Sequence, residues 1–179
     1  MRAVLSIIFL VSLVSARQIH NKIVNGKNAT QGQFPYQVSW CSDKLADDIY
    51  CFNFCGGSIF TEKTIITAAH CCEGIGPNGA IGLEWEDTKI VAGELHLLEE
   101  SGFEQVRKIK SHIKHPDYNP STLKNDICLL TLDSPLVLNE NVKRIYLDVK
   151  DPVVDATCQV SGWGDQNVSI QLHNFTEGF

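Results

Sequence analysis

The chain has 179 residues, of which 44% are hydrophobic and 20% charged, a composition typical of a globular rather than a disordered protein. Its formal net charge of −6 at pH 7 argues against nucleic acid or an anionic membrane surface as a partner. The length allows one domain, although all-β barrel domains often need roughly 200–250 residues.

The first residues have the pattern of a secretory signal peptide. Arg2 gives a positive start, residues 3–14 are almost wholly apolar, and Val14-Ser15-Ala16 is a small-residue cleavage site. About a dozen apolar residues are too few for a bilayer core, which needs about 20. We therefore expect residues 1–16 to be removed and the protein to be secreted, without a membrane anchor.

A short segment with a basic end, residues 17–22, follows the expected signal peptide. It ends in Lys22 and precedes Ile23-Val24-Asn25-Gly26. This arrangement suggests a propeptide, because cleavage after Lys22 by an activating protease would free the amine of Ile23. The alternative is an ordinary N-terminus with a chance lysine.

From there on, the hydrophobic patterns are short and β-like, and they are bounded by Gly, Pro, Asn and Asp. The runs with strand character are residues 35–40, 55–60, 64–68, 89–93, 106–113, 127–132 and 157–160. No helical periodicity is sustained over a useful length. The sequence therefore predicts an all-β protein with a barrel architecture.

Seven cysteines in a secreted chain predict a disulfide framework, and an odd number leaves one thiol without a partner within the chain. Cys41 and Cys51 lie near the ends of a polar, acidic insertion, so a disulfide between them is a reasonable hypothesis. Three glycosylation sequons begin at Asn28, Asn167 and Asn174, each of them a weak motif.

His70 follows an apolar strand pattern that ends in small residues, and it stands next to Cys71. Histidine titrates nearest neutral pH, so a histidine at a strand end is a candidate general base. Taken alone, His70 is more simply explained as a structural histidine. Asp126 taken alone is likewise more simply explained as a turn or strand cap.

Five short motifs follow one another along the chain: Ile23-Val24-Asn25-Gly26, Cys55-Gly56-Gly57-Ser58, Thr67-Ala68-Ala69-His70-Cys71, Asn125-Asp126-Ile127-Cys128-Leu129-Leu130 and Ser161-Gly162-Trp163-Gly164. Together they resemble the trypsin-like (chymotrypsin-fold) serine endopeptidases, and residues 91–95 look like the digestive trypsins of arthropods. The resemblance covers residues 23–164. It implies the first antiparallel β-barrel of a two-barrel fold, only the start of the second barrel, and a divergent tail over residues 165–179.

The resemblance implies that His70 is the general base and Asp126 its acidic partner. It also implies that Cys55 and Cys71 form the disulfide that braces the histidine loop. A serine hydroxyl is a poor nucleophile until a neighbouring base takes its proton. An aspartate bonded to the other ring nitrogen fixes the tautomer of that base and stabilises the imidazolium. The implied substrates are proteins or peptides.

No cofactor is required by the resemblance, but a structural calcium ion is one of its implications. Glu94 and Glu104 lie at the two ends of an acidic loop that corresponds to the calcium loop of the family, and carboxylates are suitable calcium ligands. The third acidic position of the family aligns with Ser101, unless the loop is shifted by one residue. A solvated acidic loop is the alternative.

The nucleophile is not found among these residues. The family carries it in a Gly-Asp-Ser-Gly-Gly segment beyond Ser-Gly-Trp-Gly, and no Gly-Asp-Ser occurs in the chain. We expect the chain to be the N-terminal portion of a zymogen and to be inactive alone, with the family partner of Cys158 in the missing part. The pairing of Cys72 and Cys128 and the side-chain preference of the enzyme stay open. The alternatives are a short secreted homologue that binds another protein without catalysis, and an incomplete gene model.

Overall fold

The computed structural model of the protein describes residues 26–45, 51–148, 150 and 154–164. The expected signal peptide, the expected cleavage between Lys22 and Ile23, and the expected tail from residue 165 lie outside these residues. The elements in chain order are the strands and helices β1 (Gln37–Ser42), β2 (Phe52–Thr61), β3 (Thr64–Thr67), α1 (Ala69–Glu73), the 3-10 helix η1 (Trp85–Asp87), β4 (Lys89–Ala92), β5 (Gln105–Lys114) and β6 (Cys128–Leu132).

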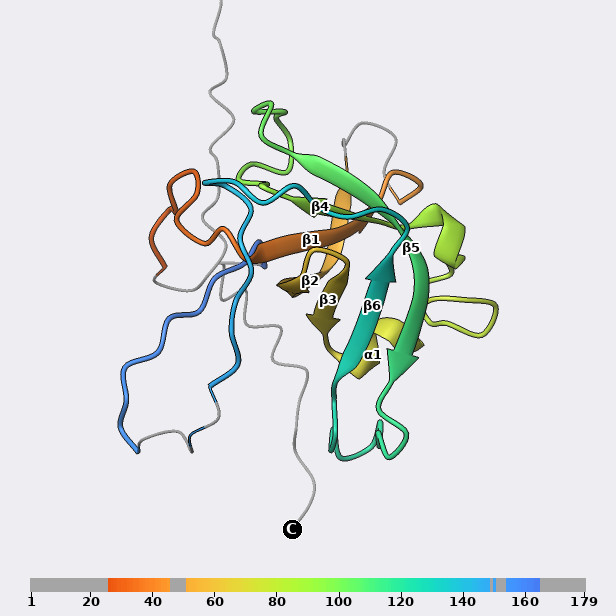
Figure 1. Ribbon diagram of the computed structural model, residues 1–179. Coiled ribbons are helices and arrows are strands. Elements are labelled where there is room, and N and C mark those ends of the chain that lie inside the picture. The colour runs from red at the N-terminus through yellow and green to blue at the C-terminus, as the bar shows by residue number, and fades with distance from the viewer. Residues whose placement is uncertain (1–25, 46–50, 149, 151–153, 165–179) are drawn as a thin grey trace, which may run out of the picture.

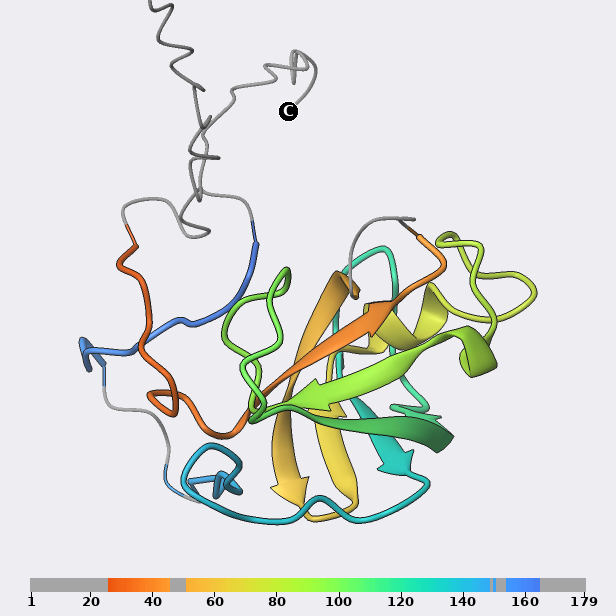
Figure 2. The ribbon, with the colours of Figure 1, turned by 90° about the horizontal axis from the view of Figure 1, so that it is seen from above.

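The strands close into one antiparallel barrel (Figures 1 and 2). Their order around the barrel is β1-β2-β3-β6-β5-β4, and β4 pairs with β1 to complete the ring. Closure leaves no free sheet edge within the barrel. The structure thus confirms the predicted all-β class and agrees with the first barrel implied by the resemblance.

The barrel core follows from the alternation of side chains along each strand. In β6, Cys128, Leu130 and Leu132 are buried, while the residues between them are partly exposed. The largest fully buried apolar side chains are Trp40, Ile59, Ile65, Ile90, Leu130, Leu132, Val38, Val91 and Val142. Complete burial of an Ile, Leu or Val side chain contributes about 1.5–3 kcal/mol. The core is therefore fixed by the same apolar runs that predict the strands.

Strand ends differ from the predicted ones where the pattern is interrupted. β1 continues to Ser42 and β2 begins at Phe52, because Cys41 and Asn53 still pair across the two strands. The run at residues 157–160 forms no strand, and it has no ladder partner among the described residues. The five-residue helix α1 is too short to produce a periodic hydrophobic pattern, so the sequence did not predict it.

The segment after β6 crosses one end of the barrel and is bound to it by backbone hydrogen bonds. The N–H of Lys143 donates to the carbonyl of Pro35 (2.8 Å), and the N–H of Ile145 donates to the carbonyl of Ile59 (2.9 Å). The buried Val142 lies in the same segment. This segment is therefore part of the barrel domain, because it adds a buried side chain to the core.

Residues 159–163 then return beside the N-terminal segment that precedes β1, as the blue and red-orange traces in Figure 2 show. The Gln37 amide donates to the carbonyl of Ser161 (3.1 Å), and the Trp163 indole donates to the carbonyl of Leu95 (3.0 Å). A cavity of about 440 Å³ lies between these segments and residues 93–99.

Six cysteines are paired, as Cys41–Cys51, Cys55–Cys71 and Cys72–Cys128, and Cys158 is free and exposed. Of the three sequons, that of Asn28 lies in the described part, where Asn28 is exposed. No helix within the described residues is long and apolar enough to cross a membrane.

Candidate active site

His70 is placed by the junction of β3 and α1. The β-branched run of β3 suits a strand, and the chain passes through Ala68, with extended backbone, into the short helix that carries His70. Ala69 is fully buried, so the start of the helix rests directly on the barrel. The His70 side chain points outward and is 57% exposed. The buried start of α1 therefore holds an imidazole that solvent can reach.

Asp126 is placed by a tight turn immediately before β6. Asn125 adopts a left-handed backbone (φ 58°), a conformation that asparagine tolerates better than most residues. Its side-chain amide donates to the carbonyl of Asp117 (2.9 Å), and its own carbonyl accepts from the N–H of Ile127 (2.8 Å). These bonds fix the turn, and the turn directs the Asp126 carboxylate toward His70.

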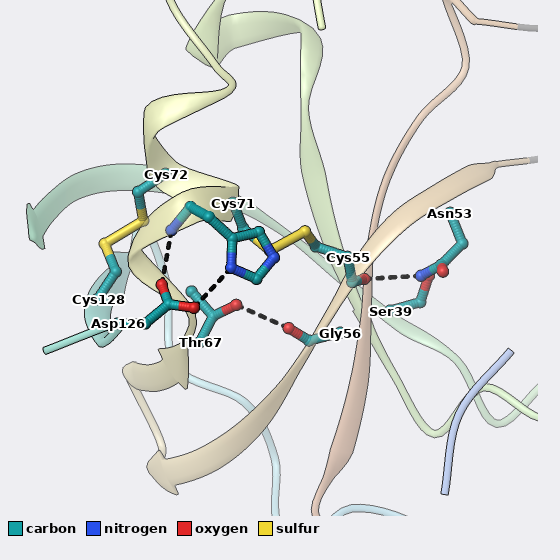
Figure 3. The surroundings of a disulfide bond; sticks show 10 residues. Ser39, Asn53, Cys55, Gly56, Thr67, Cys71, Cys72, Asp126 and Cys128 are labelled. Atoms are coloured by element: carbon teal, nitrogen blue, oxygen red, sulfur yellow. Dashed lines mark hydrogen bonds and ion pairs between the residues drawn. A yellow bond between two sulfur atoms is a disulfide. The ribbon is translucent and has the colours of Figure 1, made fainter. Parts of the chain in front are cut away.

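Both oxygens of the Asp126 carboxylate bind His70 (Figure 3). The backbone N–H of His70 donates to Oδ1 (2.9 Å), and the ring Nδ1 lies 2.7 Å from Oδ2. Desolvation raises the pKa of Asp126, but the hydrogen bonds from the His70 ring and backbone outweigh it, so this pKa lies below its ordinary value. The carboxylate is therefore ionised at neutral pH.

An ionised carboxylate can only accept hydrogen bonds, so Nδ1 must carry the proton of the shared bond. In the neutral imidazole the other nitrogen, Nε2, is then an unprotonated acceptor. The arrangement can take a proton at Nε2 from a nearby hydroxyl and stabilise the resulting imidazolium through Asp126. This is the behaviour of a general base with an oriented tautomer.

The barrel wall holds the end of β3 through polar contacts as well as a disulfide. The Thr67 hydroxyl donates to the carbonyl of Gly56 (2.7 Å), as Figure 3 shows. Cys71 is joined to Cys55 in β2. The carbonyl of Cys55 in turn accepts from the Asn53 amide (2.8 Å), which also donates to the Ser39 hydroxyl. The histidine segment is thus connected to two strands beneath it.

A metal site beside His70 does not fit the chemistry of the donors. One ligand atom each of Cys55, His70 and Cys71 lie within 4.8 Å of one another. However, the two sulfur atoms are bonded to each other, and a disulfide has no thiolate to offer a metal ion. The cluster is therefore a disulfide next to a histidine.

Glu94 follows Gly93 just after the end of β4, and its carboxylate is partly buried. Its Oε1 accepts from the backbone N–H of Leu95 (2.9 Å), whereas its Oε2 is buried and has no hydrogen-bond partner among the described residues. Burial, and then the negative charges of Glu104 and Glu100, raise the pKa of Glu94 from 4.5 to about 7. A cation at Oε2 would relieve both effects.

Glu104 has the opposite surroundings. Its carboxylate accepts from the N–H and the hydroxyl of Ser101 (2.8 and 2.6 Å) and from the N–H of Gly102 (2.8 Å). Desolvation raises its pKa, but these hydrogen bonds outweigh that effect and leave the pKa below its ordinary value. Ser101 therefore helps to hold Glu104 ionised near Glu94.

The disulfide Cys72–Cys128 is the feature of this site that the sequence left unassigned. It joins α1 to the first residue of β6. One feature of the sequence points to this disulfide. Cys72 lies two positions after His70, and Cys128 lies two positions after Asp126. If His70 and Asp126 meet, these two cysteines are within reach of each other, although the spacing does not by itself exclude other pairings.

Comparison with known proteins gives consistent matches. A family model described as Trypsin matches residues 23–176. Trypsin-1 of Astacus astacus is 38% identical over 142 residues, which cover 79% of this chain and 56% of the relative. Trypsin-4 of Rattus norvegicus is 38% identical over 152 residues (84% and 53%), and Trypsin-3 of Homo sapiens is 34% identical over 145 residues (81% and 41%). The chain spans about half the length of these curated relatives.

Proposed function

Because the chain belongs to the trypsin family of serine proteases, we propose that it forms part of a secreted serine endopeptidase that cleaves proteins or peptides. In that enzyme His70 is the general base and Asp126 is its acidic partner. The observation that carries the proposal is the pair of bonds between them, with Nδ1 to Oδ2 at 2.7 Å and the backbone N–H to Oδ1 at 2.9 Å.

The chemistry follows from this pair. Nε2 of His70 takes the proton of a serine hydroxyl as its oxygen attacks the peptide carbonyl, and Asp126 stabilises the imidazolium that forms. The imidazolium then gives its proton to the leaving amine, and water hydrolyses the acyl-enzyme by the same route. We place the serine outside these 179 residues, because no Gly-Asp-Ser occurs in them. We therefore propose that this chain alone lacks peptidase activity.

The decisive experiment compares two secreted products with a fluorophosphonate probe, which labels an activated serine. One is the 179-residue chain, and the other is translated from any longer in-frame transcript that encodes residues 23–164 followed by Gly-Asp-Ser-Gly-Gly. After the cut between Lys22 and Ile23, we expect labelling of the longer product alone, and its loss in His70→Ala. Labelling of the 179-residue chain, or full labelling of the longer His70→Ala variant, would contradict the proposal. A stable 179-residue product that binds a protein without cleaving it would favour the non-catalytic alternative.

Secretion and activation are parts of the same proposal, supported by the sequence of residues 1–23. We propose removal of residues 1–16 on secretion and a later cut by an activating protease between Lys22 and Ile23. N-terminal sequencing of the secreted product should give Arg17 first, and Ile23 after treatment with a lysine-specific protease. Lys22→Gln should block the second step. An unprocessed Met1 terminus in the medium, or the same second cut in Lys22→Gln, would contradict this part.

A structural calcium ion is the last part of the proposal. The buried Oε2 of Glu94 has no hydrogen-bond partner among the described residues, and Glu104 adds a second carboxylate nearby, so the donors suit a hard cation. Glu94 and Glu104 would hold the ion, which would neutralise their repulsion and stiffen the loop between them. We expect calcium to raise the melting temperature at pH 8. An unchanged melting temperature would argue for a solvated acidic loop.

A further inference from the structure

The two partners of the proposed catalytic pair are brought together from distant parts of the chain. His70 and Asp126 are separated by 56 positions. Each is followed at two positions by a cysteine, and these cysteines, Cys72 and Cys128, are bonded to each other. The covalent path between the partners through this disulfide is only a few residues long. We propose that the Cys72–Cys128 disulfide is a positioning device that holds His70 and Asp126 in register, an inference that rests on the proposed function for its catalytic meaning.

The proposed catalytic pair and the disulfide beneath it differ in burial. The side chains of His70 and Asp126 are 57% and 21% exposed, so solvent competes for their hydrogen bonds. Ion pairs in contact with solvent contribute little to holding two segments together. In contrast, Cys72 is 4% exposed and Cys128 is 1% exposed. The alignment of the pair must therefore come from the backbone below it, where the disulfide lies.

The helix α1 is not stable by itself. It has five residues, and its N-cap, Ala68, makes no side-chain hydrogen bond to the first turn. Isolated helices of this length do not form, because nucleation is costly and few hydrogen bonds follow it. The position of His70 must therefore be set by what α1 is attached to.

The attachments of α1 lead in two directions. Figure 3 shows that the adjacent residues Cys71 and Cys72 bond to different parts of the barrel. Cys71 bonds to Cys55 in β2, which fixes the helix on one side but gives it no connection to Asp126. Cys72 bonds to Cys128, which pairs with Thr67 in β3 and begins the strand that Asp126 precedes. Of the two disulfides, only the second therefore joins the helix to the segment that carries Asp126.

Precise alignment matters because hydrogen bonds tolerate little displacement. The Nδ1 to Oδ2 distance of 2.7 Å is that of a short charge-assisted bond. A shift of about 1 Å in the helix would break it, and a misplacement of this size in an active site can cost on the order of 100-fold in rate. A crosslink two residues from each partner limits such a shift more than a crosslink elsewhere in the barrel.

The test uses the 179-residue chain and a substitution that replaces the disulfide by apolar side chains, Cys72→Ala with Cys128→Val. The matched control removes another buried disulfide, Cys41→Ala with Cys51→Ala. NMR measures the alignment of His70 and Asp126 in two ways. One is the downfield resonance of the His70 Nδ1 proton, and the other is the pKa of Asp126, obtained from its carboxyl ¹³C shift. Barrel amide shifts show whether each variant is folded.

In the folded Cys72→Ala/Cys128→Val variant we expect loss of the Nδ1 resonance and a rise of the Asp126 pKa toward its ordinary value. The control should keep both signals. An unchanged resonance and an unchanged Asp126 pKa in that variant would show that the disulfide is merely a crosslink, and would overturn the inference. In the longer product, the same change should slow probe labelling on the order of 100-fold, with the control unaffected.

If the variant does not fold, hydrogen exchange on the native chain decides. The His70 amide, which donates to Asp126, must then exchange as slowly as the most protected amides of β3 and β6. Exchange of this amide through local opening would overturn the inference. Neither NMR nor exchange depends on catalysis. An aligned pair together with a longer product that the probe does not label would therefore refute the proposed function and leave this inference standing.

Discussion

Replacing Glu94 by glutamine tests whether a buried carboxylate in the acidic loop makes the stability of the protein depend on pH. The pKa of Glu94 is raised to about 7 in the folded protein, because the side chain is partly buried and faces Glu104 and Glu100. In the unfolded chain it titrates near its ordinary value of 4.5. The folded state therefore favours the protonated form, and its stability falls as the pH rises from 4.5 through about 7.

The size of this loss follows from the difference between the two pKa values. A rise from 4.5 to about 7 corresponds to about 3 kcal/mol at roughly 1.4 kcal/mol per pH unit. Because the Glu94 side chain keeps contact with solvent, screening reduces this figure, and we expect about 1–2 kcal/mol. Glutamine cannot ionise, so Glu94→Gln should lack this part of the pH dependence.

The assay is urea unfolding of the wild type and Glu94→Gln at pH 4.5 and pH 8, without calcium. The difference in free energy of unfolding between the two proteins should shift by about 1–2 kcal/mol in favour of the variant at pH 8. Any effect of the new amide on the free energy of unfolding that does not depend on pH cancels when the two pH values are compared. Glu99→Gln makes the same charge change on an exposed residue of the same loop and should show a much smaller shift. An equal difference at both pH values, or an equal shift in the control, would refute the argument.

Three further predictions concern the core, a turn and the catalytic pair. The Leu130 side chain is fully buried, so Leu130→Ala should lower the free energy of unfolding by about 2–5 kcal/mol. The Leu98 side chain is 57% exposed, so Leu98→Ala should change it by under about 0.5 kcal/mol. Similar losses for the two variants in urea unfolding would contradict the assignment of Leu130 to the core. Gly93→Ala and Gly102→Ala both strain a left-handed backbone, but only the first new Cβ meets a backbone oxygen, that of Phe103 at 2.5 Å. Gly93→Ala should therefore lower the melting temperature more, and equal shifts would argue against this close contact. In the longer product, Asp126→Asn should slow probe labelling on the order of 100- to 10,000-fold, because its amide can hold His70 in the wrong tautomer, while Asp133→Asn should leave labelling unchanged.

The barrel was predictable from the sequence because each strand carries a local signal. Runs such as Thr64 to Ala68 and Ile127 to Leu132 combine β-branched or apolar residues with polar boundaries, and they became β3 and β6. The run at residues 157–160 has the same local signal but no strand partner among the described residues. Local pattern predicts a capacity to form a strand, whereas pairing decides whether one forms.

The candidate site was only partly predictable, because its geometry depends on contacts between distant residues. The motif order indicated His70 and Asp126, but not the second hydrogen bond from the His70 backbone. The left-handed turn at Asn125 has no periodic signal, although asparagine permits it. The pairing of Cys72 with Cys128 could not be derived from spacing alone, since several cysteine pairings were compatible with the sequence.

The arrangement of the site also separates the part that is fixed from the part that reacts. The Asp126 carboxylate and Nδ1 of His70 are joined above the buried Cys72–Cys128 disulfide and the partly buried Cys55–Cys71 disulfide, whereas more than half of the His70 side chain is exposed. A hydroxyl that reaches Nε2 therefore meets an imidazole whose tautomer and direction are already set, and no rearrangement of the barrel is needed for proton transfer. In the proposed enzyme the base would therefore be oriented before the nucleophile arrives, and the folding of the barrel would supply the free energy that aligns it.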